Sequence, residues 1–142
     1  MLKTGIAFAA VLALSVNAAQ ASGDAEKGKR VFNKCKACHM VGENAKKRVG
    51  PPLNNIIGAK AGSQDGYNYS KAMKTAGEEG LVWDDEKLDA YLLKPKDVVP
   101  KGKMAFPGLK KDSDRENVIA YLKEFTKADD KKEEKTEEKK AQ

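Results

Sequence analysis

The sequence is poor in the side chains that bind metals and fill hydrophobic cores. Two cysteines and one histidine occur among 142 residues, and aromatic residues make up 6% of the chain. A zinc site needs four protein ligands, or three and an open position, so this set makes zinc a poor candidate. Two cysteines also cannot supply the disulfide framework that stabilises many small exported domains. A small domain built from this material needs another source of stabilisation.

Apolar runs long enough to cross a membrane are missing beyond the first residues. The stretch 1–21 begins with one early lysine, continues as a short apolar run and ends in the small-residue pattern Ala19-Gln20-Ala21. This layout is typical of a cleaved secretory signal, and the run is short for a retained span of about 20 residues. We therefore expect residues 1–21 to be removed on export.

The other end of the chain lacks large apolar residues. Residues 127–142 consist mostly of lysines and acidic residues, and like charges recur four positions apart. Such a composition cannot contribute to a core, and this charge spacing weakens an isolated helix. We expect a charged, disordered tail at 127–142 and a single domain over residues 22–126.

No segment of the domain alternates with the period of a β-strand, whereas helical patterns recur. Helices are predicted over residues 24–38, 70–76, 84–94 and 113–125. Asp24, Ser70 and Asp84 or Asp85 are the expected N-caps, and Gly77 is expected to end the second helix.

Two details of these helices carry further expectations. Ser113 and Glu116 have the spacing of a capping box at the start of the last helix. Gly28 lies inside the first helix, where glycine costs about 1 kcal/mol relative to alanine, and is best tolerated where another backbone comes close. The remaining segments are long loops, which a small all-helical domain can order only around a central group.

Both cysteines and the only histidine lie together in the segment CKACH, at positions 35–39. The spacing C-x-x-C-H is a signature of covalent c-type haem attachment, and the adjacent histidine would bind the iron. A thioredoxin-like dithiol would require a βαβ unit, for which no strand pattern exists. A local disulfide between Cys35 and Cys38 in an exported protein without haem remains an alternative.

The iron of such a haem needs a second axial ligand, and the sequence has no second histidine. Met1 is expected to leave with the signal, and Met40 adjoins His39 and cannot reach the opposite face of the haem. Met73 lies in a predicted helix, where a core role is favoured. Met104, in the loop PKGKMAFPGLK, is therefore the expected sixth ligand. A thioether ligand raises the reduction potential and closes the iron to exchangeable ligands, which favours electron transfer.

Over residues 23–125 the chain resembles class I cytochrome c, in particular the bacterial c2 type. The resemblance rests on the segments GDAEKGKRVF, CKACH, GPPL, GYNYS, WDDEKLDAYLLKPKDVVPKGKMAFPGLKK and IAYLKEF, in this order and at compatible spacing. It implies an all-α class I cytochrome c fold, in which the N- and C-terminal helices cross. Further helices and long loops would wrap around one haem c, covalently attached through Cys35 and Cys38. His39 and Met104 would be the axial iron ligands.

The resemblance also implies a haem environment. The carbonyl of Pro51 is expected to accept a hydrogen bond from the other ring nitrogen of the ligating histidine. Tyr69 and Trp83 resemble the donors to a buried haem propionate, and Tyr91 resembles the tyrosine close to the methionine sulfur. Phe106 resembles the aromatic residue at the exposed haem edge.

Two departures and one agreement with the family pattern stand out. Ala59 lies where many members have an arginine near a propionate, and Met73 lies where many have an asparagine. Gly28 matches the glycine at which the first and last helices cross, with Tyr121 packed against it.

The resemblance implies electron transfer without catalysis. We expect a monomeric, soluble periplasmic carrier, without stable membrane insertion or nucleic-acid binding, that passes electrons from a cytochrome bc1-type complex to a terminal oxidase or photosynthetic reaction centre. A periplasmic dehydrogenase is the alternative donor, and a haem enzyme or gas sensor with a labile sixth ligand is the rival class.

A formal net charge of +6 supports docking to acidic partner surfaces. The lysines expected around the haem edge are Lys34, Lys36, Lys46, Lys47, Lys94, Lys96, Lys101, Lys103, Lys110 and Lys111.

Overall fold

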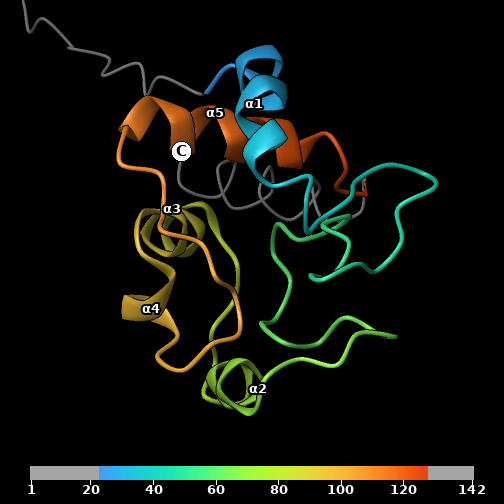
Figure 1. The fold of residues 1–142 in the computed structure, drawn as a ribbon, viewed down its shortest axis with the longest axis vertical. Helices are drawn as coiled ribbons and strands as arrows, with labels where there is room; N and C mark the ends of the chain where they lie inside the picture. Colours follow the sequence, from blue (N-terminus) through green and yellow to red (C-terminus); the bar gives the residue numbers. More distant parts are fainter. Residues whose placement is uncertain (1–22, 128–142) are drawn as a thin grey trace, which may run out of the picture.

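Helices and long loops make up residues 23–127, the part of the chain that this computed structural model describes (Figure 1). The elements are α1 (Ala25–Val31), the 3-10 helix η1 (Phe32–Lys34), α2 (Lys71–Glu78), α3 (Asp85–Leu93), α4 (Pro95–Val98) and α5 (Asp112–Lys123). Within this range, extended backbone pairs only as one antiparallel bridge between Lys60 and Val82. The predicted all-α fold is therefore confirmed. The expected signal at 1–21 and the expected tail beyond Lys127 lie outside the described residues.

The first and last helices cross at a glycine, as predicted (Figure 1). An ideal Cβ built on Gly28 would lie 1.9 Å from the carbonyl oxygen of Asn117 and 2.8 Å from Cβ of Tyr121. The Asn117 side chain accepts a 2.7 Å hydrogen bond from the backbone N–H of Asp24. The rings of Phe32 and Tyr121 pack with their centroids 5.4 Å apart. The missing side chain at Gly28 thus lets α1 lie directly on the backbone of α5.

Three of the expected N-caps are confirmed. Asp24, Ser70 and Asp84 each accept a hydrogen bond from the backbone N–H three residues later, at 3.0, 3.1 and 2.7 Å respectively. Each of these bonds satisfies one of the N–H groups that a helix start leaves without an intrahelical partner.

The expected boundaries of the first and last helices were wrong. The α-helix that begins at Ala25 ends at Val31 and tightens into η1, so residues 35–38 form a turn beyond the helix. The last helix begins at Asp112 with Lys111 at its N-cap, so the capping box expected at Ser113 does not form. Acidic residues in the first turn, including Asp112, instead interact favourably with the helix dipole.

The end of α2 and the start of α4 also differ from the helix boundaries predicted from glycine and proline. The helix expected to end at Gly77 runs to Glu78. Gly77 serves packing instead, because an ideal Cβ there would lie 1.9 Å from the carbonyl oxygen of Ala61. The chain reverses later, at Gly80, where φ is +100°. Pro95 does end α3, but it also begins the short helix α4, for which proline is well suited at the first position.

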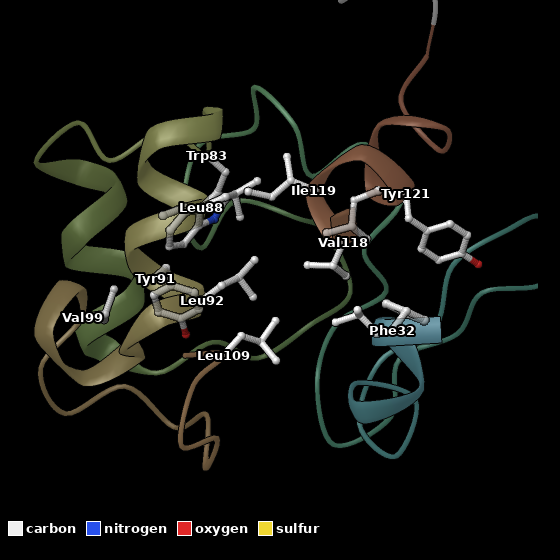
Figure 2. Close-up of a cluster of buried hydrophobic side chains, with 13 residues drawn as sticks. Phe32, Trp83, Leu88, Tyr91, Leu92, Val99, Leu109, Val118, Ile119 and Tyr121 are labelled. Atoms are coloured by element: carbon white, nitrogen blue, oxygen red, sulfur yellow. The ribbon is translucent and has the colours of Figure 1, made fainter. Parts of the chain in front are cut away.

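Buried hydrophobic side chains gather in two neighbouring regions (Figure 2). Phe32, Val118 and Tyr121 lie at the crossing of α1 and α5. Leu88, Tyr91 and Leu92 of α3 lie close to Trp83, whose ring centroid is 4.8 Å from that of Tyr91.

Arg115 is a buried cation that ties α5 to two other segments. Its side chain donates to the carboxylates of Asp89 on α3 and Asp112, both at 2.7 Å. It also donates to the carbonyl oxygens of Leu109 at 2.9 Å and Lys110 at 3.3 Å. The hydrogen bond to Asp89 raises the pKa of the guanidinium, so the group stays charged despite burial. Nothing in the sequence had pointed to this residue.

Substituting Gly28 by alanine is expected to lower the free energy of unfolding by about 2–3 kcal/mol, because the added methyl group would force α1 away from the Asn117 carbonyl. Urea unfolding of the haem-containing protein measures this. Lys29→Ala, on the exposed side of the same helix, serves as the control and should change stability by about 0.5 kcal/mol or less. Equal stabilities of the two variants would contradict a backbone contact at Gly28.

Candidate haem attachment site

The turn after η1 presents two thiols and an imidazole within five residues. The N–H groups of Cys38 and His39 donate to the carbonyl oxygen of Cys35, at 3.0 and 2.9 Å. Both cysteines are half-buried, and both thiols are free. Burial raises the pKa of the Cys35 thiol to about 11, which keeps it protonated at neutral pH.

His39 is held by its side chain as well as by its backbone. Its ring is buried, and Nδ1 donates to the carbonyl oxygen of Pro51 at 2.7 Å. A carbonyl can only accept, so this contact assigns the proton to Nδ1 and leaves Nε2 with its lone pair. Burial lowers the pKa of His39, although the bond to Pro51 opposes the shift. The ring is therefore neutral, which is the form that binds a metal.

Gly50 is a further glycine that makes a close approach possible, and the sequence analysis did not single it out. An ideal Cβ there would lie 2.4 Å from Cε1 of His39. The Gly50 N–H donates to the carbonyl of Cys38 at 2.9 Å, so the segment before Pro51 is held against the cysteine turn. The only sequence signal for this role was the first letter of GPPL.

Met104 lies in the loop between α4 and α5 and is half-buried against the core. The loop is anchored at the two residues directly before Met104. The ammonium group of Lys96 donates to the carbonyl of Gly102, and that of Lys103 donates to the carbonyl of Asn68 at 3.2 Å. These contacts position the backbone directly before Met104.

The two other methionines of the described chain have different surroundings. Met73 is half-buried in the first turn of α2, where its N–H is capped by Ser70. Met40 is half-buried and directly follows His39.

The aromatic residues expected near a haem fall into separate groups. Trp83 and Tyr91 are buried and in contact, and burial raises the pKa of Tyr91 to about 12, so its hydroxyl keeps its proton. Tyr69 is half-buried and makes an edge contact with Tyr67 at 4.8 Å between centroids. Phe106 is half-buried. The sequence analysis did not assign Tyr67 a role, although it lies in the GYNYS segment.

The residues present fit a covalently held haem. One turn supplies two thiols and a neutral, oriented imidazole, and a half-buried thioether lies on a loop elsewhere in the fold. Many apolar side chains that touch the core nevertheless remain only partly buried, as expected where they also line an apolar group. Among them are Leu53, Ile56, Ile57, Met73, Leu81, Val98, Met104 and Phe106. Residues 23–127 contain no group of three or more His, Cys, Asp or Glu side chains that could hold a metal ion such as zinc.

Comparisons with known proteins agree with this fit. The family model described as Cytochrome c matches residues 25–126. Cytochrome c2 of Afifella marina is 58% identical over 98 residues, which cover 69% of this chain and 79% of that protein. Cytochrome c2 of Rhodomicrobium vannielii is 56% identical over 104 residues, covering 73% and 81%.

A solved structure of cytochrome c2 from Rhodospirillum centenum has a TM-score of 0.71 at 41% identity and covers 74% of this chain and 100% of that chain. Among the helices of residues 23–127, none has the length and apolar character needed to cross a membrane.

Substituting Gly50 by alanine is expected to displace the His39 ring or break its bond to Pro51, because the new methyl group would overlap the imidazole. The expected results are a perturbed haem absorption spectrum and a loss of about 2 kcal/mol in stability. Val49→Ala changes the neighbouring, exposed side chain and should leave the spectrum unchanged. An unperturbed spectrum in Gly50→Ala would show that this glycine does not support the histidine.

Proposed function

This chain belongs to the cytochrome c family and is of the bacterial c2 type, and on that premise we propose that it shuttles single electrons between membrane redox complexes of a bacterial periplasm. The family carries covalently attached haem c and transfers electrons without catalysing a reaction on a substrate. The observation that carries the finer proposal is the 2.7 Å contact between His39 Nδ1 and Pro51, within the turn that also bears both thiols.

The proposed attachment uses Cys35 and Cys38 for the two thioether bonds, with Nε2 of His39 and the sulfur of Met104 as axial ligands. When bound, haem c supplies an iron that gains and loses one electron. The protein keeps the imidazole neutral and oriented through the hydrogen bond from Nδ1 to the Pro51 carbonyl. A thioether is a soft ligand, so Met104 would favour the ferrous state and keep exchangeable ligands away from the iron.

The proposed haem environment consists of buried or half-buried groups that exclude water. Trp83 and Tyr69 are proposed to donate to a propionate. Tyr91 would lie near the methionine sulfur, and its raised pKa means that no phenolate charge arises there in the physiological pH range. Phe106, half-buried, is proposed at the exposed edge through which electrons pass.

Excess positive charge supports docking to acidic partners. Of the ten lysines expected around the haem edge, Lys34 pairs with Asp114 at 3.4 Å and Lys94 pairs with Asp97 at 2.9 Å. The other eight have no carboxylate within 4.0 Å among residues 23–127, so their charge is available to a partner. We propose a cytochrome bc1-type complex as donor and a terminal oxidase or reaction centre as acceptor, reached by a monomer after removal of residues 1–21.

Replacing Met104 by alanine is expected to abolish the weak far-red absorption band of ferric iron bound to a thioether. The midpoint potential should fall on the order of 0.1 V, within the range of about 0.8 V that axial ligands set. Absorption spectroscopy and redox titration measure both effects. Met73→Ala is the matched control and should keep the band; its loss there, with retention in Met104→Ala, would make Met73 the ligand.

Oxidation of the reduced protein by bacterial membranes that contain a terminal oxidase tests the function itself. The rate should fall about tenfold or more between low salt and 1 M salt, because screening shortens the Debye length to about 3 Å. Lys46→Glu/Lys47→Glu should slow the low-salt reaction several-fold, whereas Lys74→Glu on exposed α2 should have little effect. A wild-type protein that membranes do not oxidise would overturn the proposed function.

A further inference from the structure

Tyr67 reaches from the loop of residues 66–70 to the backbone behind His39. Its hydroxyl donates a 2.6 Å hydrogen bond to the carbonyl oxygen of Val49, 18 positions earlier in the chain. Its ring meets that of Tyr69 edge-on, at 4.8 Å between centroids. The tyrosine thus connects two loops that lie on different sides of the candidate site.

The hydroxyl holds one end of a peptide group whose other end is held by the cysteine turn. The Val49 carbonyl and the Gly50 N–H belong to the same peptide group, which is planar. The carbonyl accepts from Tyr67, and the N–H donates to the carbonyl of Cys38 at 2.9 Å. Bonds at both ends fix the plane of this group, and with it the position of the Gly50 Cα.

The backbone of Gly50 lies directly against the imidazole. An ideal Cβ on Gly50 would lie 2.4 Å from Cε1 and 2.7 Å from Nδ1 of His39. The Gly50 carbonyl is also engaged, because it accepts from the N–H of Arg48 at 2.9 Å. A rotation of the peptide group between Val49 and Gly50 would therefore move backbone atoms that touch the ring.

Prolines transmit this position to the carbonyl that orients His39. The ring of Pro51 locks its own φ, and Pro52 restricts the ψ of Pro51 to extended values. Gly50, which has no side chain, is the flexible joint between the peptide group that Tyr67 holds and the Pro51 carbonyl. That carbonyl accepts from Nδ1 of His39 at 2.7 Å, so its placement depends on how firmly Gly50 is held.

We propose that Tyr67 is a positioning residue for the proposed axial histidine. Its hydroxyl fixes the peptide group between Val49 and Gly50, and thereby keeps the Pro51 carbonyl on Nδ1 of His39. This inference rests on the proposed function. A carbonyl acceptor on Nδ1 makes the imidazole a more basic ligand, which favours ferric over ferrous iron. Loss of the Tyr67 hydroxyl therefore raises the reduction potential.

The test compares Tyr67→Phe with wild type in the haem-containing protein. The substitution removes the hydroxyl and keeps the ring against Tyr69. At a fixed ambient potential, the ratio of reduced to oxidised protein should rise about two- to three-fold, which is about 18–28 mV at 59 mV per tenfold for one electron. Hydrogen exchange at the Gly50 N–H, followed by NMR in the reduced protein, should become about tenfold faster. The N–H of His39, bonded to Cys35 within the turn, should keep its rate and serves as the internal reference.

Ser63→Ala is the matched control. Ser63 also donates from a hydroxyl to a carbonyl oxygen, that of Lys60 at 2.7 Å, in the loop that precedes Tyr67. The substitution removes a bond of the same kind that does not involve residues 49–51. The potential and the Gly50 exchange rate of Ser63→Ala should therefore match wild type. Equal shifts in Ser63→Ala and Tyr67→Phe would assign the effect to general loosening of the loop and overturn the proposal.

The proposal requires both changes in Tyr67→Phe, a raised potential and faster exchange at Gly50. Either change without the other, or a lowered potential, overturns it. A potential shift in Tyr67→Leu but not in Tyr67→Phe would assign the effect to the ring contact with Tyr69 and overturn it as well. Both readouts need only an attached haem. Failure of bacterial membranes to oxidise wild type would therefore overturn the proposed function alone, and the two changes in Tyr67→Phe would still establish the positioning role.

Discussion

Helix α5 is the support on which both halves of the candidate site depend. On one side, its backbone packs against α1 at Gly28. Helix α1 continues directly into η1 and the turn that contains Cys35 and Cys38. On the other side Arg115 holds the carbonyls of Leu109 and Lys110, at the end of the loop that contains Met104. Contacts of α5 thus reach the segments that lead to both proposed iron ligands, although these ligands are far apart in sequence.

Backbone carbonyls do much of the positioning in the site. The Pro51 carbonyl orients the His39 ring, and the Cys35 carbonyl closes the turn. The carbonyl of Gly102 accepts from Lys96 of α4, and the carbonyl of Asn68 accepts from Lys103 of the Met104 loop. A carbonyl has a fixed place once the chain is folded, and it cannot change protonation. Ordered loops therefore serve this protein as well as helices would, because each loop contributes acceptors at defined points.

Long loops in a small domain need such contacts because they bury little surface of their own. Asn54 illustrates the solution: its side chain both accepts from and donates to the backbone of Gly42, at 2.8 Å in each case. The half-buried apolar side chains along these loops, among them Ile56, Ile57 and Leu81, complete their burial only against an apolar group. Haem c and the loops are thus suited to stabilise one another.

Local patterns were enough to predict some features. The thiols and imidazole of CKACH lie within five residues, so their proximity did not depend on the rest of the fold. The caps at Asp24, Ser70 and Asp84 act over three residues and were predicted for the same reason. The family resemblance also predicted that the first and last helices cross at Gly28. Local rules failed at Ser113, because α5 begins one residue earlier, at Asp112. They also failed at Gly77, which packs against the carbonyl of Ala61 from a distant segment.

By itself, the sequence determined that the chain attaches a haem, that its domain is helical and that its charge is positive, because each follows from neighbouring residues or from composition. Only the tertiary structure decided which glycine lies against the His39 ring and which arginine is buried between α3 and α5. Those features depend on backbone groups brought together from distant segments. Nearly every residue has the same backbone carbonyl and N–H, so the amino-acid sequence does not show which backbone group will lie near a given side chain.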